Sequence, residues 1–246
     1  TLTGPVTLNN NAVISAANTT VQINGSVTDA GTSKNLTISN GASYLSNTNI
    51  TGAVTANQVS LTSRNMSLGG EYNLASSLAV SVTNAATVSG AIKGAGVTLT
   101  KTEVGSLSLS GANTYTGATT ISAGSLNVSG SLSDSNAITV ASGATYNLNA
   151  SDTVGSIAGA GTISTSTSGL KTLSVGNDDS STTFSGVIQN GSGSLALTKV
   201  GTGTFTLTGN NTYTGATTVS FGSLKLAPST TVDRLLSGGI VNNADV

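Results

Sequence analysis

The stretch LTKTEVGSLSLSGANTYTGATTISAGSLNV, from Leu99 to Val128, determines how the chain is interpreted. It aligns without a gap to LTKVGTGTFTLTGNNTYTGATTVSFGSLKL, from Leu197 to Leu226, with an offset of 98 residues and 18 identities in 30 positions. Internal repeats of this kind come first in predicting a fold. The two copies are either a chemical motif used twice or a structural unit used twice.

Apolar and small polar residues alternate inside the repeat, as in SLSLS (106–110) and TFTLT (204–208), and this alternation is typical of half-buried strands. Apolar-x-apolar pairs recur about every 20 residues, separated by turns rich in Gly, Asn or Ser. Short strands that bend in one sense at each turn wind into stacked coils. The sequence therefore predicts an all-β chain, a parallel β-solenoid of about 12 coils of roughly 20 residues, in which 1–246 form a single domain with repeat units near 88–128 and 184–226.

The turn inside each copy is predicted to form a corner of its coil. Glycine bends the chain there, and Gly and Asn tolerate positive φ. The Asn side chain is expected to bond the corner backbone, and the Tyr ring either covers the corner or serves as an exposed ligand anchor. The lysine before each turn, Lys101 and Lys199, is expected to be solvated, with a structural bond to a carbonyl as the alternative. The predicted corner residues are Gly111, Asn113, Tyr115 and Gly117 in the first copy and Gly209, Asn211, Tyr213 and Gly215 in the second.

Composition argues against several functional classes. Only 7% of residues are charged, the net charge is −1 and the eight basic residues are scattered, so we expect no nucleic-acid partner. His and Cys are both absent, which removes the common catalytic triads and the usual zinc sites. No apolar run is long enough to span a bilayer. A short helical turn is expected only at Asp233–Leu236, ended by Gly238.

The acidic residues offer little for catalysis. Only Asp178 and Asp179 are adjacent, and neighbours on a strand point to opposite faces. No pair of carboxylates suited to glycan cleavage and no Ser-Lys motif stands out. The segment GNDDSS (176–181) is interpreted as a solvated loop, with a calcium site as the alternative. We therefore expect no enzyme activity, no catalytic residues, no cofactor and no metal.

The segment from Ser185 to Leu224 resembles the passenger-associated transport repeat of bacterial autotransporters. The resemblance lies in three patterns that follow one another in the order SG-x-I, L-x-K-x-G-x-G and G-x-N-x-Y-x-G. The first copy, Ser89 to Leu126, departs from the pattern where Glu103 and Val104 replace its first Gly. The resemblance implies a right-handed parallel β-helix that is secreted through an outer-membrane barrel and displayed outside the cell. It associates the repeat with transport and folding, and the passenger with adhesin-like or scaffold roles.

These observations lead to an extracellular protein of the bacterial cell surface, acting as an adhesin or a display stalk. Its partner would be a glycan or protein of a host-cell or matrix surface. The alternative is a protein that self-associates into an extracellular fibre or sheath, and ice binding through Thr-x-Thr pairs is a third hypothesis. No C-terminal set of amphipathic membrane strands is present, so membrane attachment is expected only through a barrel outside this sequence.

Overall fold

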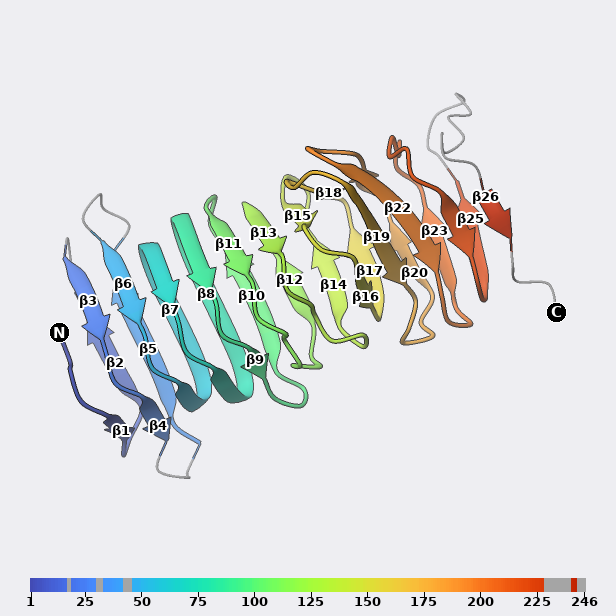
Figure 1. Ribbon diagram of the computed structural model, residues 1–246. Helices are drawn as coiled ribbons and strands as arrows, with labels where there is room; N and C mark the ends of the chain where they lie inside the picture. Colours follow the sequence, from blue (N-terminus) through green and yellow to red (C-terminus); the bar gives the residue numbers. More distant parts are fainter. Residues whose placement is uncertain (17–18, 30–32, 42–45, 228–239, 243–246) are drawn as a thin grey trace. The chain divides into compact units, whose positions relative to one another are not determined.

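A computed structural model describes residues 1–16, 19–29, 33–41, 46–227 and 240–242. Every regular element among them is a β-strand, and strands stack in parallel into about 11 solenoid turns, close to the 12 expected (Figure 1). The predicted helical turn at 233–236 lies outside the described residues. The parallel β-solenoid is thus confirmed, while its right hand remains a prediction. The chain divides into two compact units, Thr1–Leu126 and Asn127–Val246.

The first unit has three strand faces, and successive coils add one strand to each. One face joins β1, β4, β7, β8 and β9; a second joins β2, β5, β7, β8, β10 and β12; a third joins β3, β6, β7, β8 and β11. Each of β7 and β8 continues through all three faces. The strands are β1 (Val6–Leu8), β2 (Ala12–Ser15), β3 (Thr20–Ile23), β4 (Val27–Asp29), β5 (Asn35–Asn40), β6 (Asn47–Ile50), β7 (Val54–Leu68), β8 (Tyr72–Val88), β9 (Ile92–Lys93), β10 (Thr98–Thr102), β11 (Ser106–Leu109) and β12 (Thr119–Ile121).

The second unit repeats this plan. One face joins β14, β17, β20, β23 and β25, a second joins β15, β18 and β21, and a third joins β16, β19, β22, β24 and β26. Strand β13 (Ser125–Val128) spans the division between the units. The remaining strands are β14 (Ala137–Val140), β15 (Thr145–Leu148), β16 (Asp152–Val154), β17 (Ser156–Gly159), β18 (Thr162–Ser164), β19 (Leu170–Val175), β20 (Thr182–Phe184), β21 (Val187–Ile188), β22 (Ser194–Lys199), β23 (Thr204–Leu207), β24 (Thr217–Val219), β25 (Ser223–Leu226) and β26 (Ile240–Asn242).

The parallel register places like residues above one another. In the first unit the inward column reads Ile14, Ile38, Leu61, Val80, Lys101 and Ile121. In the second unit a matching column reads Val154, Val175, Lys199 and Val219. These columns form a continuous apolar interior, and burial of their methyl and methylene groups is the main stabilising contribution. A lysine therefore occupies a core position in each unit.

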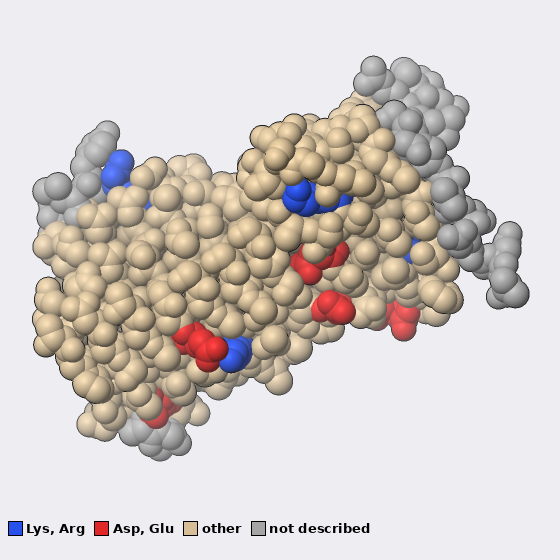
Figure 2. All heavy atoms as spheres, in the orientation of Figure 1, with Lys and Arg blue, Asp and Glu red and all other residues tan. Residues whose placement is uncertain are grey.

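The outer surface carries few charged side chains, as the face shown in Figure 2 illustrates. Asparagine amides form hydrogen-bonded ladders along it. Asn65 Nδ2 donates to Asn47 Oδ1 over 2.9 Å, and Asn84 Nδ2 donates to Asn65 Oδ1 over 2.7 Å. Such ladders stabilise stacked parallel strands without placing like charges above one another.

Candidate functional site

The residues common to the two repeats surround one corner in each unit. In the first repeat, β10 and β11 lead into Gly111–Gly117, which we call the first corner, and β12 follows it. In the second repeat, β22 and β23 lead into Gly209–Gly215, the second corner, and β24 follows. The two corners are compared below group by group.

The corner asparagines bond the backbone of their own turn and of the preceding coil. Asn113 Oδ1 accepts from the Ile92 amide over 3.0 Å, while its Nδ2 donates to the Gly111 carbonyl over 2.9 Å. Asn211 repeats both contacts, with the Ile188 amide at 2.9 Å and the Gly209 carbonyl at 3.0 Å. Each side chain is buried and satisfies backbone groups that the corner removes from the strand ladders.

The corner tyrosines point into the core. Tyr115 and Tyr213 are both 0% exposed, and each hydroxyl lies 2.7 Å from a threonine Oγ1, that of Thr119 or Thr217. Burial raises the pKa of Tyr213 to about 12, against the smaller opposing effect of the Thr217 hydrogen bond. The interpretation of these rings as exposed ligand anchors is therefore wrong.

The corner glycines are required by close approach rather than by dihedral angle. None of the four has a positive φ, so the expectation of positive φ is wrong at these positions. A Cβ on Gly111 would lie 2.6 Å from the Gly90 carbonyl oxygen, and one on Gly209 would overlap the Gly186 carbonyl. Gly117 and Gly215 face the carbonyls of Val97 and Leu195 in the same way. Each corner thus packs its backbone directly on the preceding coil.

The two lysines are buried, so the expectation that they are solvated is wrong. The alternative, a structural bond from each lysine to carbonyl groups, is confirmed. Both side chains are 0% exposed. Lys101 Nζ donates to the carbonyls of Thr102 at 2.6 Å, Glu103 at 2.8 Å and Ala123 at 3.3 Å. Lys199 Nζ donates to the equivalent carbonyls of Val200, Gly201 (2.8 Å) and Phe221 (3.5 Å). Each ammonium joins the turn after its own strand to the turn one coil further on.

Burial lowers the pKa of Lys101 to about 8, and the neighbouring Glu103 carboxylate opposes this shift. Burial also lowers the pKa of Lys199, and the carboxylates of Asp179 and Asp178 oppose this shift. At pH 7 the Lys101 side chain therefore remains mainly protonated and supplies three donors to three carbonyls. The geometry assigns it a structural role, since its nitrogen faces backbone oxygens rather than solvent.

The departure of the first copy from the repeat pattern has a visible consequence. Glu103 occupies the position of Gly201, and both residues have the left-handed conformation, with φ of 64° and 67°. This conformation costs a residue with a Cβ about 1 kcal/mol relative to glycine.

We expect Glu103→Gly to stabilise the first unit by about 0.5–1 kcal/mol, because glycine adopts this φ without strain. Glu103→Gln, which keeps the Cβ and removes the charge, serves as the control for the lost attraction to Lys101. Urea denaturation of the three proteins measures both effects. A Glu103→Gly protein no more stable than Glu103→Gln would contradict the strain argument.

The adjacent acids Asp178 and Asp179 accept hydrogen bonds from their own loop and from the next coil, respectively. Asp178 Oδ1 accepts from the Ser180 amide at 3.0 Å and hydroxyl at 2.6 Å, and Asp179 Oδ1 accepts from the Thr202 amide at 2.7 Å. Burial raises the pKa of Asp178, but hydrogen bonds from Ser180 and Ser156 together hold it below its usual value. Within the described part of the chain, no three His, Cys, Asp or Glu residues gather as metal ligands would.

A second pair of acids was not expected from the sequence. Asp134 and Asp152 line one hollow of about 260 Å³ with Ser151, Thr153, Thr172 and Ser174. Asp152 Oδ2 accepts from the Leu132 amide at 2.8 Å. Burial, with a smaller contribution from Asp134, raises the pKa of Asp152 to about 6, against hydrogen bonds from Leu132 and Thr153. Their separation of 18 residues, close to one coil, is the signal that could have identified the pair.

This shift predicts a pH-dependent stability. The pKa of Asp152 is higher in the folded than in the unfolded chain. The favourable contribution of Asp152 to the free energy of unfolding is therefore fully present below pH 3.8 and is lost as pH rises through about 6. Asp152→Asn keeps an acceptor for the Leu132 amide and should lose this dependence. In urea denaturation the variant should therefore gain stability relative to wild type between pH 4 and pH 7, whereas a constant difference would contradict the assignment.

Comparison with known families agrees with this geometry. The family model of the passenger-associated-transport-repeat matches residues 99–128 and 197–226, which contain both lysines and both corners. The chain is a β-solenoid with two passenger-associated transport repeats, which is consistent with an autotransporter passenger domain. Each repeat is built from buried side chains that bond backbone or a buried threonine, and the repeat family implies a secreted domain displayed at the cell surface.

Comparison of the chain with curated proteins and with solved structures gave no significant match. Among its described residues, no helix has the length and apolar character needed to cross a bilayer.

Proposed function

We propose that this passenger is a non-catalytic extracellular surface protein that acts as an adhesin or a display stalk. The observation that carries the proposal is that the residues shared by the two repeats have structural contacts. The shared lysines, asparagines and tyrosines are buried, and their polar atoms are bonded to backbone or to a buried threonine. A motif used in this way supports architecture, which leaves recognition to the outer surface.

The chemistry of the chain supports a non-catalytic role. It contains no His or Cys, and Asp178 accepts a bond from its own loop while Asp179 accepts one from the Thr202 amide in the next coil. The chain as a whole has only 7% charged residues. We therefore assign no catalytic residue, no cofactor and no metal, and take a glycan or protein of a host-cell or matrix surface as the partner.

One observation favours self-association as a second candidate. Only 7% of residues are charged and the net charge is −1, so copies of the chain repel one another little, and Leu170 and Phe221 are 59% and 65% exposed. Weak repulsion together with exposed apolar side chains favours association between copies, which would build a fibre or sheath.

Two measurements on the purified passenger separate these functions. Light scattering as a function of concentration determines whether the chain is a monomer, and binding to cultured epithelial cells and to fibronectin- or collagen-coated surfaces determines whether it adheres. The adhesin or stalk predicts a monomer at all concentrations with saturable surface binding. Ordered filaments with no surface binding would contradict it and support the fibre.

A further inference from the structure

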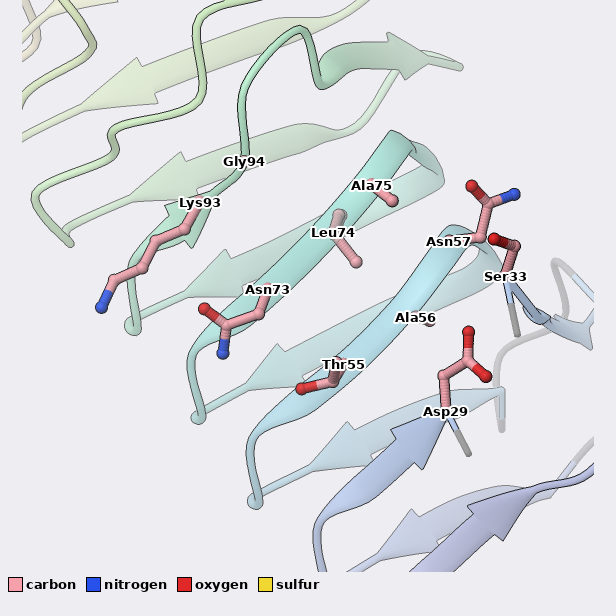
Figure 3. Close-up of a pocket in the computed structure, with 10 residues that line it drawn as sticks. All are labelled: Asp29, Ser33, Thr55, Ala56, Asn57, Asn73, Leu74, Ala75, Lys93 and Gly94. Carbon is pink, nitrogen blue, oxygen red and sulfur yellow. The ribbon is translucent and has the colours of Figure 1, made fainter. Parts of the chain in front are cut away.

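A hollow of about 380 Å³ lies on the first unit, away from the repeat (Figure 3). It sits where the chain turns from the face containing β4, β7, β8 and β9 to the face containing β5, β7, β8 and β10. The residues that line it are Asp29, Ser33, Thr55, Ala56, Asn57, Asn73, Leu74, Ala75, Lys93 and Gly94. We call this hollow the notch.

The notch results from unequal turn lengths in successive coils. On β7 and β8, Thr55 pairs with Asn73 before the corner, and Gln58 pairs with Ser77 after it. Strand β7 therefore turns the corner with two residues, 56–57, while β8 uses three, 74–76. In the next coil Lys93 pairs with Asn73, and Thr98 with Ser77, so that the turn takes residues 94–97. The shorter turn of β7 is recessed beside the longer turns of the next two coils, and this side of the recess is therefore set by backbone register rather than by side-chain rotamers.

The notch has a small apolar floor and a polar rim that includes the charged residues Asp29 and Lys93. Ala56 and Leu74 are almost fully buried, at 3% and 6% exposed, and Ala75 beside them is exposed. Figure 3 shows Asp29, Ser33 and Asn57 gathered at one end, with Thr55 and Asn73 along the side toward Lys93.

The charges at the notch are partly neutralised. Lys93 Nζ bonds Glu71 Oε1 at 2.8 Å, so the cation at this end is paired. Asp29 Oδ2 accepts from the Lys34 amide at 2.6 Å, which fixes the carboxylate at the other end. An anionic ligand would have to displace Glu71 from Lys93 and would face the Asp29 carboxylate, whereas a neutral polyhydroxyl ligand would meet neither obstacle.

We propose that the notch binds a neutral hexose residue of a glycan. Carboxylate and amide groups can accept and donate hydrogen bonds to sugar hydroxyls, and the alanine and leucine floor suits the C–H face of a pyranose ring. One fixed carboxylate with surrounding amides can orient such a ring. The inference rests on the proposed adhesin function and specifies the class of its partner. Because the notch is shallow and lacks an aromatic platform, a single site should bind weakly, with a Kd on the order of 1 mM.

The test uses the full chain labelled with ¹⁵N and titrated separately with lactose, maltose and α-1,2-mannobiose, with sialyllactose as the charged comparison. Two variants on β8 form a matched pair of exposed alanines. Ala75→Leu fills the notch, whereas Ala85→Leu adds the same side chain on another face. Asp29→Asn keeps an acceptor for the Lys34 amide and removes the charge.

At least one neutral sugar is expected to shift the amide signals of Asn57, Asn73 and Ala75 saturably. Ala75→Leu should weaken that binding at least about 10-fold, while Ala85→Leu leaves it unchanged. Asp29→Asn should weaken it by a smaller factor.

Three results would each overturn the proposal. None of the three neutral sugars shifts these signals, sialyllactose alone binds, or the Ala75→Leu protein binds the sugar as well as wild type does. A chain that adheres to cells or matrix yet shows any of these results would retain the proposed function and lose only the notch.

Discussion

Gly209→Ala is expected to prevent stable folding of the second unit. A Cβ at this position would overlap the carbonyl oxygen of Gly186 in the preceding coil. Gly186 lies in the bend between β20 and β21, which pair with β17 and β18 of the preceding coil, so its carbonyl can move little without disturbing these strands. The expected loss of stability is about 4 kcal/mol or more, a large part of the stability of a small domain.

Gly4→Ala is the control for this prediction, because nothing lies within 4 Å of the Cβ that it would add. Gly4 is the first of a column of glycines that continues through Gly25 and Gly52. Its substitution should change stability by less than about 1 kcal/mol. Circular dichroism during thermal and urea unfolding measures both variants, and a Gly209→Ala protein as stable as Gly4→Ala would contradict the close-packed corner.

Lys199→Met has the second largest expected effect. Methionine fills a similar volume but leaves the carbonyls of Val200, Gly201 and Phe221 without their ammonium donor. A buried polar group that loses its partner costs about 1–3 kcal/mol, so we expect a loss of about 3 kcal/mol after partial relaxation of the turns. Lys101→Met should act similarly in the first unit, since its three carbonyl contacts are equivalent.

Lys93→Met is the matched control, because the Lys93 side chain is 40% exposed and its ion pair with Glu71 is on the surface. An exposed pair of this kind contributes less than about 1 kcal/mol. The three variants can be compared by urea denaturation at constant pH. Equal and small losses in all of them would show that the buried ammonium groups do not hold the turns together.

Much of the fold could be predicted from the sequence because a parallel solenoid pairs like with like. Leu78, Leu99 and Thr119 stand in one column, and the spacing between them is the period visible in the sequence. The two copies with an offset of 98 residues also have equivalent Asn, Tyr and Lys contacts, which is why one motif described both.

The position of the lysines was harder to predict, although the sequence contains the signal. Strict alternation from the inward Leu99 places Lys101 inward as well. Its charge favours the opposite, exposed position, and the carbonyls of Thr102, Glu103 and Ala123 make the inward position favourable.

Other features depend on register that no single repeat reveals. Asp134 and Asp152 line one hollow because their separation is close to one coil, and the notch exists because Ala56 and Asn57 turn a corner that the next coil turns with three residues, 74–76. The corner glycines similarly depend on the distance to the preceding coil, which dihedral preferences do not indicate.

The claim that the repeat serves architecture is tested most directly by labelling lysine amines of the folded protein with an acylating reagent and locating the labels by mass spectrometry. The account predicts that the exposed Lys93 and Lys225 react at once, while Lys101 and Lys199 react only after the chain is unfolded in urea. Labelling of Lys101 and Lys199 at the rate of Lys93 in the folded protein would show that the repeat presents its lysines to solvent, and would contradict the account.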